Sequence, residues 1–196
     1  GGTRGVTSFA AERLPLQLVQ PWLARAVPGA QIAGALTIDA PQVRWTTDPQ
    51  RGLLVQTSGR IEVQEFEFTA DALQGDSVVA RQISAPWQLS LQGDQISIEQ
   101  LAIDTGWSKL TAQGSLSRAE LTTLDLKNLP KSEATLVGSI DVARLAAMLP
   151  QTLQLRDDVR IESGQLRLRA DSKPAASGFT WTASASIEGV GGSTRG

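Results

Sequence analysis

The stretch Gly59-Arg60-Ile61-Glu62-Val63 decides the fold, because it places apolar side chains at alternate positions after a glycine. The same signature, Gly-x-(Leu/Ile)-x-(Leu/Ile/Val), recurs at 34–38, 138–142 and 164–168, with a partial copy at 114–116. A period of two gives each strand one apolar and one polar face. We expect each glycine to supply the turn or bulge that starts a strand. The sequence therefore predicts a mainly β protein with a large, one-sided sheet.

A second pattern predicts which residues line the apolar side. Two stretches 35 residues apart share an apolar spacing with a three-residue step at its centre. Such a step predicts a bulge that keeps the apolar side chains on one face. Further strand candidates follow along the chain, and 121–127 is one of them. The segments between the candidates are too short for helical crossovers, which predicts an antiparallel meander. The predicted lining residues are Ile61, Val63, Phe66, Phe68, Ile96, Ile98, Leu101 and Ile103.

Two short helices interrupt the strands. The first is expected within 15–27, with Pro21 as a kink or first-turn proline. The second is expected over 142–149, with Asp141 as its N-cap and Pro150 at its end. Similar residues follow both helices, which indicates an internal repeat. The predicted organisation is a boundary segment at 1–13, a helix-plus-sheet unit at 14–140, the start of a second unit at 141–190 and a Gly-rich boundary at 191–196.

Composition excludes several kinds of chemistry. The 196 residues contain no cysteine and no histidine, which removes thiol catalysis, disulfides and the commonest metal ligands. Lys and Arg number 18 against 20 acidic residues, so a nucleic-acid partner is not expected. No apolar run is long enough to span a membrane. The first residues lack a methionine, and we expect a segment of a longer protein with no cofactor or metal.

One short motif suggests catalysis. Asp104-Thr105-Gly106 matches the aspartic-protease motif, in which two aspartates share a proton. Trp107 replaces the usual small hydroxylated residue, and no second copy exists in the chain, so a protease would have to be a homodimer. A turn explains the same residues. Other carboxylates are expected to be solvated or to lie in turns: Glu62, Glu65, Glu67 and Asp157-Asp158. We therefore expect the chain not to be an enzyme.

The aromatic residues are unusual, because five tryptophans occur without any tyrosine. Their spacing favours packing in the core or at sheet edges. If Trp45, Trp87 and Trp181 were exposed on one face, a closed β-sandwich that binds protein or glycan would be favoured instead.

The helices and signature strands together resemble the AsmA-like and TamB-like family. The resemblance is carried by 14–29, 137–145 and 161–168. It implies a curled or sandwich-like antiparallel sheet with two short α-helices, whose hydrophobic groove carries phospholipid acyl chains or assists outer-membrane assembly. It also implies a periplasmic or cell-envelope location, a membrane anchor outside this chain, and contacts with neighbouring repeats and envelope proteins. Periodicity alone leaves open whether the sheet forms a groove or a closed sandwich.

Overall fold

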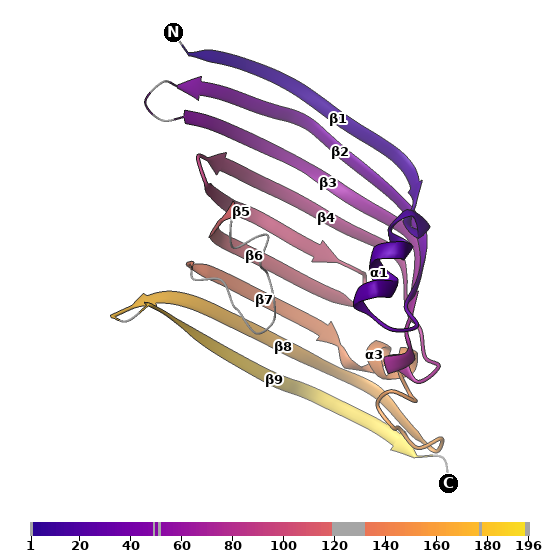
Figure 1. Cartoon of the computed structure of the whole chain (residues 1–196). Helices are drawn as coiled ribbons and strands as arrows, with labels where there is room; N and C mark the ends of the chain where they lie inside the picture. Colours follow the sequence, from indigo (N-terminus) through magenta and orange to yellow (C-terminus); the bar gives the residue numbers. More distant parts are fainter. Residues whose placement is uncertain (1, 49, 51, 119–131, 177, 195–196) are drawn as a thin grey trace.

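A computed structural model describes the chain except for residues 1, 49, 51, 119–131, 177 and 195–196. The described residues form one antiparallel sheet in which each strand pairs with the next along the sequence (Figure 1). The protein is mainly β structure, as predicted, and its sheet is not closed. The strand candidate at 121–127 lies outside the described residues. The strands are β1 (Thr3–Pro15), β2 (Gln31–Asp48), β3 (Gly52–Thr69), β4 (Val78–Gln92), β5 (Gln95–Asp104), β6 (Ser108–Ser117), β7 (Ala134–Asp141), β8 (Val159–Ala175) and β9 (Gly178–Thr194).

Helical segments connect strands at one end of the sheet, the right-hand end in Figure 1. The 3-10 turn η1 (Leu16–Val19) and helix α1 (Gln20–Ala26) join β1 to β2, the 3-10 turn η2 (Asp71–Leu73) follows β3, and α3 (Val142–Met148) joins β7 to β8. Both predicted helices are confirmed. Pro21 lies in the first turn of α1, and the Asp141 carboxylate accepts a hydrogen bond from the Arg144 backbone N–H at 3.0 Å.

Strand pairing places apolar side chains on one face across the sheet, because directly paired residues of an antiparallel ladder point to the same side. We call this side the apolar face. One row of paired residues crosses it from β3 to β9 and consists of Gly59, Trp87, Leu101, Ala112, Leu136, Ala170 and Ala183. A row on the opposite, polar face consists of Thr37, Glu62, Ser84, Asp104, Lys109, Ser139, Arg167 and Ser186.

The predicted bulges are confirmed in β3 and β5. In β5 the pairing advances by three residues between Ile98 and Leu101 while β6 advances by two. In β3 the pairing slips opposite Gly34, where Glu65 adopts a positive φ of 51°. Each extra residue restores the alternation after an odd step. The apolar side chains therefore stay on one face through both irregularities.

The signature glycines lie inside strands, so the expectation that they start strands was wrong, although Gly34 and Gly164 do lie at irregularities of the ladder, as expected of bulge glycines. Gly59 and Gly138 stand in the middle of β3 and β7, with no positive φ. Gly34 and Gly164 have φ values of 132° and 143°, which only glycine adopts without strain. Their physical role is close approach by another group, because a Cβ added at each would meet neighbouring atoms within 3.3 Å.

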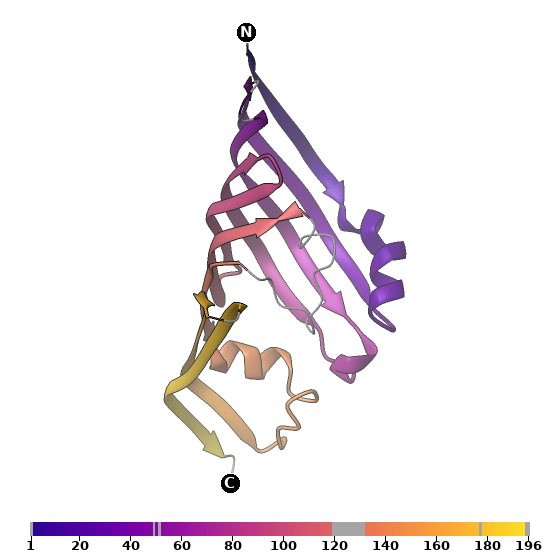
Figure 2. The same cartoon turned by 60° about the vertical axis from the view of Figure 1, so that its left-hand side comes forward.

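Two of these glycines let helical segments rest on the apolar face. A Cβ at Gly34 would lie 3.2 Å from the Leu16 Cδ1 atom of η1, and a Cβ at Gly164 would lie 3.2 Å from the Val142 Cβ atom of α3. Leu16 is buried there. Figure 2 shows the sheet curling around the side on which α3 lies. The helical segments therefore cover part of the apolar face at one end of the strands.

A hydrogen-bonded link joins two connections at this end of the sheet. The buried Asp76 Oδ2 atom accepts from the Thr152 backbone N–H at 2.7 Å and lies 2.9 Å from its hydroxyl. The same hydroxyl lies 2.8 Å from the Leu73 carbonyl oxygen. The link ties the segment after β3 to the segment after α3, across the four intervening strands β4 to β7.

The fold exposes far more surface than a compact protein of its size. Its accessible surface is 13152 Å², whereas a compact monomer of 20.8 kDa exposes about 8,900 Å². No large side chain among the described residues is fully buried. The predicted boundary segments contribute to this surface, since 3–13 and 191–194 belong to the edge strands β1 and β9. The sandwich alternative does not describe this fold, because the described residues form a single open sheet.

Candidate apolar binding face

All eight predicted lining residues lie on the apolar face. Four come from β3 and four from β5. Ile61 and Val63 lie on this face because they follow Gly59 at even spacing. Phe68 pairs with Ile32, and Val63 pairs with Leu36. Ile32 and Leu36 are four residues apart in β2 and point to the same side, so Phe68 lies on the same face as Val63. Phe66 precedes Phe68 by two residues and shares that face. Ile96, Ile98, Leu101 and Ile103 pair with alternate residues of β6.

Strand β4, where the sequence predicts strand candidates at 77–83 and 87–92, lies between the two predicted sets, but its apolar side chains were not among the predicted lining residues. Its side chains pair with both neighbours, as Leu91 does with Val55 and Ile96. Ile83 pairs with Val63, and Leu89 pairs with Ile98. The alternation from Trp87 to Leu91 was a usable signal for this set. The apolar face is therefore continuous from β3 through β4 to β5.

The apolar face is only partly shielded. Of the eight predicted residues only Val63 is buried, with 8% of its surface exposed, and the other seven are half-buried. Aliphatic residues in a closed core are usually fully buried. Among the described residues, the cover comes from neighbouring side chains and from the helical segments at one end. The face keeps apolar surface that a guest molecule could bury.

Three tryptophans lie on this face. Trp45 and Trp87 pair with glycines of neighbouring strands, Gly5 and Gly59, and a Cβ at Gly59 would lie 2.5 Å from the Trp87 ring. Trp181 pairs with Ser172 at the β8–β9 ladder. Trp45 is 36% exposed, and the other two are half-buried. Large rings thus cover the positions where the neighbouring strand has no side chain.

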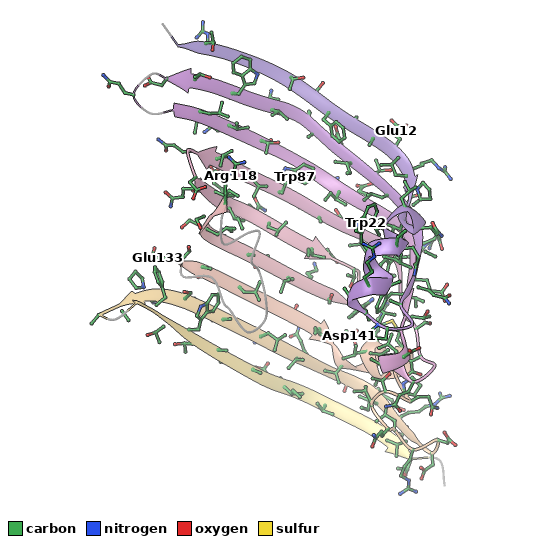
Figure 3. The ribbon with its side chains drawn as sticks, viewed as in Figure 1. Glu12, Trp22, Trp87, Arg118, Glu133 and Asp141 are labelled. Atoms are coloured by element: carbon green, nitrogen blue, oxygen red, sulfur yellow. The ribbon has the colours of Figure 1, made fainter. Side chains whose placement is uncertain are left out.

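The remaining tryptophans lie elsewhere. Trp22 projects from α1 with 66% of its surface exposed, whereas Trp87 lies in the middle of the sheet (Figure 3). The Trp107 Nε1 atom donates to the Val79 carbonyl oxygen at 3.1 Å. Trp107 therefore ties the β5–β6 turn to the start of β4.

The polar face carries ion pairs between neighbouring strands or alternate residues of one strand. Lys109 Nζ lies 3.3 Å from Asp104 Oδ2, Arg167 lies 3.4 Å from Glu188, and Arg169 lies 2.6 Å from Asp171. Hydrogen bonds from Arg169, with a smaller contribution from Thr135, lower the pKa of Asp171. Each of these three basic groups therefore has an acidic partner on the same face.

The Asp-Thr-Gly motif forms the β5–β6 turn. Asp104 Oδ1 accepts from the Gly106 backbone N–H at 2.8 Å, and its other oxygen faces Lys109. The Gly106 N–H, with help from the Lys109 ammonium, lowers the pKa of Asp104. Thr105 completes the turn, because its hydroxyl accepts from the Ser108 backbone N–H at 2.9 Å. Both carboxylate oxygens of Asp104 therefore have structural partners, and the geometry gives the protease interpretation no support.

Two of the other acidic residues lie in separate ion pairs. Glu62 lies on the polar face beside Arg60. Asp158 pairs with Arg156 in the connection before β8. Over the part of the chain that the structure describes, no group of three acidic residues could hold a metal ion.

Two further findings bear on function. Within the described residues, no helix combines the length and apolar composition needed to cross a membrane. No protein-family model matches the chain, and neither does any curated protein or solved structure. The resemblance to AsmA-like and TamB-like proteins therefore rests on the residue pattern alone.

Proposed function

We propose that this chain is a non-enzymatic segment of a cell-envelope protein whose apolar face holds phospholipid acyl chains, for lipid transport or outer-membrane assembly. The observation that supports the proposal is the row of paired apolar residues that crosses the sheet while remaining partly exposed. The family resemblance supports the same function and suggests a periplasmic location.

The dimensions and energetics of the face suit an acyl chain. Eight spacings between nine strands give a path of about 38 Å across the sheet. Each buried methylene contributes about 0.8 kcal/mol, so burying about ten of them supplies about 8 kcal/mol, which corresponds to micromolar affinity. Such binding is non-directional. It needs a continuous apolar lining rather than a fixed set of polar groups.

Native mass spectrometry of the purified chain tests this proposal with two adjacent substitutions in β5. Ile98→Glu places a carboxylate on the apolar face, whereas Ser97→Glu places one on the polar face, because Ser97 pairs with Ser90 and Ser115. We expect co-purified phospholipid, or added dipalmitoylphosphatidylglycerol, to be retained by Ser97→Glu and lost from Ile98→Glu. Equal retention by both variants, or lipid-free wild-type protein after reconstitution, would overturn the proposal.

A binding module that uses aromatic rings is the second candidate, because Trp45, Trp87 and Trp181 share one face. Aromatic side chains of this kind stack on sugars and apolar ligands. This alternative predicts that a soluble glycan or peptide changes the tryptophan fluorescence. It also predicts no retained phospholipid in the native mass spectrum.

A further inference from the structure

Among the described residues, strand β9 forms one edge of the sheet and pairs with β8 alone. Residues 178–194 contain no Lys, Arg or Pro, and the single charged residue, Glu188, faces Arg167 of β8. Ile187 is 60% exposed and Val190 is 57% exposed. Natural sheets protect such edges with charges, prolines, bulges or short strands. Here the pairing of the 17-residue strand with β8 shifts register twice, and both shifts fall near its C-terminal end, beside Gly189.

The opposite edge has more of this protection. Strand β1 carries Arg4, Glu12 and Arg13 and ends at Pro15. Its pairing with β2 shifts register between Thr7 and Phe9 and again between Ala11 and Leu14, so the shifts divide β1, whereas those of β9 lie near one end. The two edges are therefore unequal, and β9 presents the better template for another strand.

The regular part of β9 is self-complementary. Between Gly178 and Glu188 the pairing with β8 has no irregularity in β9. If two copies pair antiparallel about Ala183, large side chains meet β-branched or small ones, and Glu188 meets a glycine rather than a second carboxylate. On the apolar face Phe179 pairs with Ile187 and Trp181 pairs with Ala185. On the polar face the pairs are Thr180 with Ser186, Thr182 with Ser184 and Gly178 with Glu188.

We propose that β9 pairs with β9 of a second copy about a two-fold axis at Ala183, perpendicular to the sheet. A rotation about this axis reverses the strand direction and keeps both apolar faces on the same side. Head-to-tail stacking of β9 on β1 would instead give a parallel junction, because the first and ninth strands of the meander run in the same direction. Parallel pairing is slightly less stable than antiparallel pairing.

The strength of the contact is typical of a specific interface. Eleven paired residues, from Gly178 to Glu188, form about 11 backbone hydrogen bonds. Specific interfaces contain about 10 direct hydrogen bonds. The row of apolar residues that ends at Ala183 then continues directly into the second copy. The result is one sheet with a doubled apolar face.

Charge substitutions at the axis test the proposal, because Ala183 of one copy would pair with Ala183 of the second copy. Sedimentation equilibrium of the wild-type chain should give twice the 20.8 kDa monomer mass. Ala183→Lys and Ala183→Asp should each be monomeric, since like charges then oppose each other. Mixing the two variants should restore the dimer, which also shows that both are folded. A monomeric wild type, or a mixture that stays monomeric, would overturn the proposal.

Thiol cross-linking tests the register against other arrangements, and the chain contains no native cysteine. A short bismaleimide should link Ala183→Cys into a covalent dimer, because directly paired Cβ atoms lie about 5 Å apart. Val6→Cys, on the exposed edge of β1, should remain monomeric. Cross-links between the two variants, or polymers of the wild type, would establish head-to-tail pairing and overturn the proposal. Since mass and lipid content are measured separately, a monomer that retains phospholipid contradicts this inference alone.

Discussion

The two mid-strand glycines of the signature should respond oppositely to alanine. Gly59 lies on the apolar face of β3, opposite a bulge of β2. A Cβ there would collide with the Asp39 carbonyl oxygen and would lie 2.5 Å from the Trp87 ring. Gly138 lies on the same face of β7, where the nearest atom to a new Cβ is the Leu110 Cδ1 atom at 3.2 Å. One site meets backbone, and the other meets the flexible end of a side chain.

These contacts give the expected magnitudes. Overpacking against backbone costs about 1–3 kcal/mol, so Gly59→Ala should lower the melting temperature by about 2–12 °C in a chain of this length. At Gly138 a small movement of Leu110 relieves the contact. The loss of glycine's excess freedom in the unfolded chain then contributes about 0.5–1 kcal/mol in favour of folding. Gly138→Ala should therefore leave the free energy of unfolding unchanged or raise it slightly.

Urea unfolding followed by tryptophan fluorescence measures both variants against wild type. The slope of the transition should stay constant, because neither change alters the surface exposed on unfolding. If both alanines destabilise the chain equally, the glycines serve backbone conformation and not close approach. If Gly59→Ala is harmless, the register of β2 against β3 is wrong at this point.

Three further changes test separate parts of the fold. Thr152→Val should lower the free energy of unfolding by about 1–3 kcal/mol in urea titrations, because it removes a hydroxyl partner of the buried Asp76. Asp141→Ala should cost about 1 kcal/mol through loss of the α3 N-cap, measured the same way. Arg169→Gln should raise the pKa of Asp171 in a carboxyl NMR titration. Because the folded pKa is lowered, the pair stabilises the fold at neutral pH and this stabilisation is lost as pH falls through that pKa.

Periodicity predicted the sheet well because it reports directly which side of a strand is apolar. The three-residue steps in β3 and β5 also predicted their bulges, since no regular strand keeps Ile98 and Leu101 on one face. The helices were predictable from their proline and aspartate boundaries. The glycine positions misled the prediction, because a glycine that admits a neighbouring ring or helix looks the same in sequence as a glycine that makes a turn.

The link between Asp76 and Thr152 could not be predicted, because its partners lie 76 residues apart and neither belongs to a motif. The candidate face was predictable only in part. Its two phenylalanine and isoleucine sets stand out by their repeat, whereas β4 supplies the connecting residues without any such repeat. The pairing of β4 with both β3 and β5 joins the two sets into one surface, and the sequence does not show this strand pairing.

Side-chain size explains why alternation left an open and a closed sheet equally plausible. In β3 to β5 the apolar face carries tall side chains such as Ile61, Trp87 and Leu101. In the same row β6 to β9 carry Ala112, Ala170 and Ala183, with Leu136 between them. A closed core needs matching volumes on its two sides. Along this row the small side chains of β6, β8 and β9 offer less apolar volume than those of β4 and β5, and a flexible apolar guest or a second copy would gain by covering them.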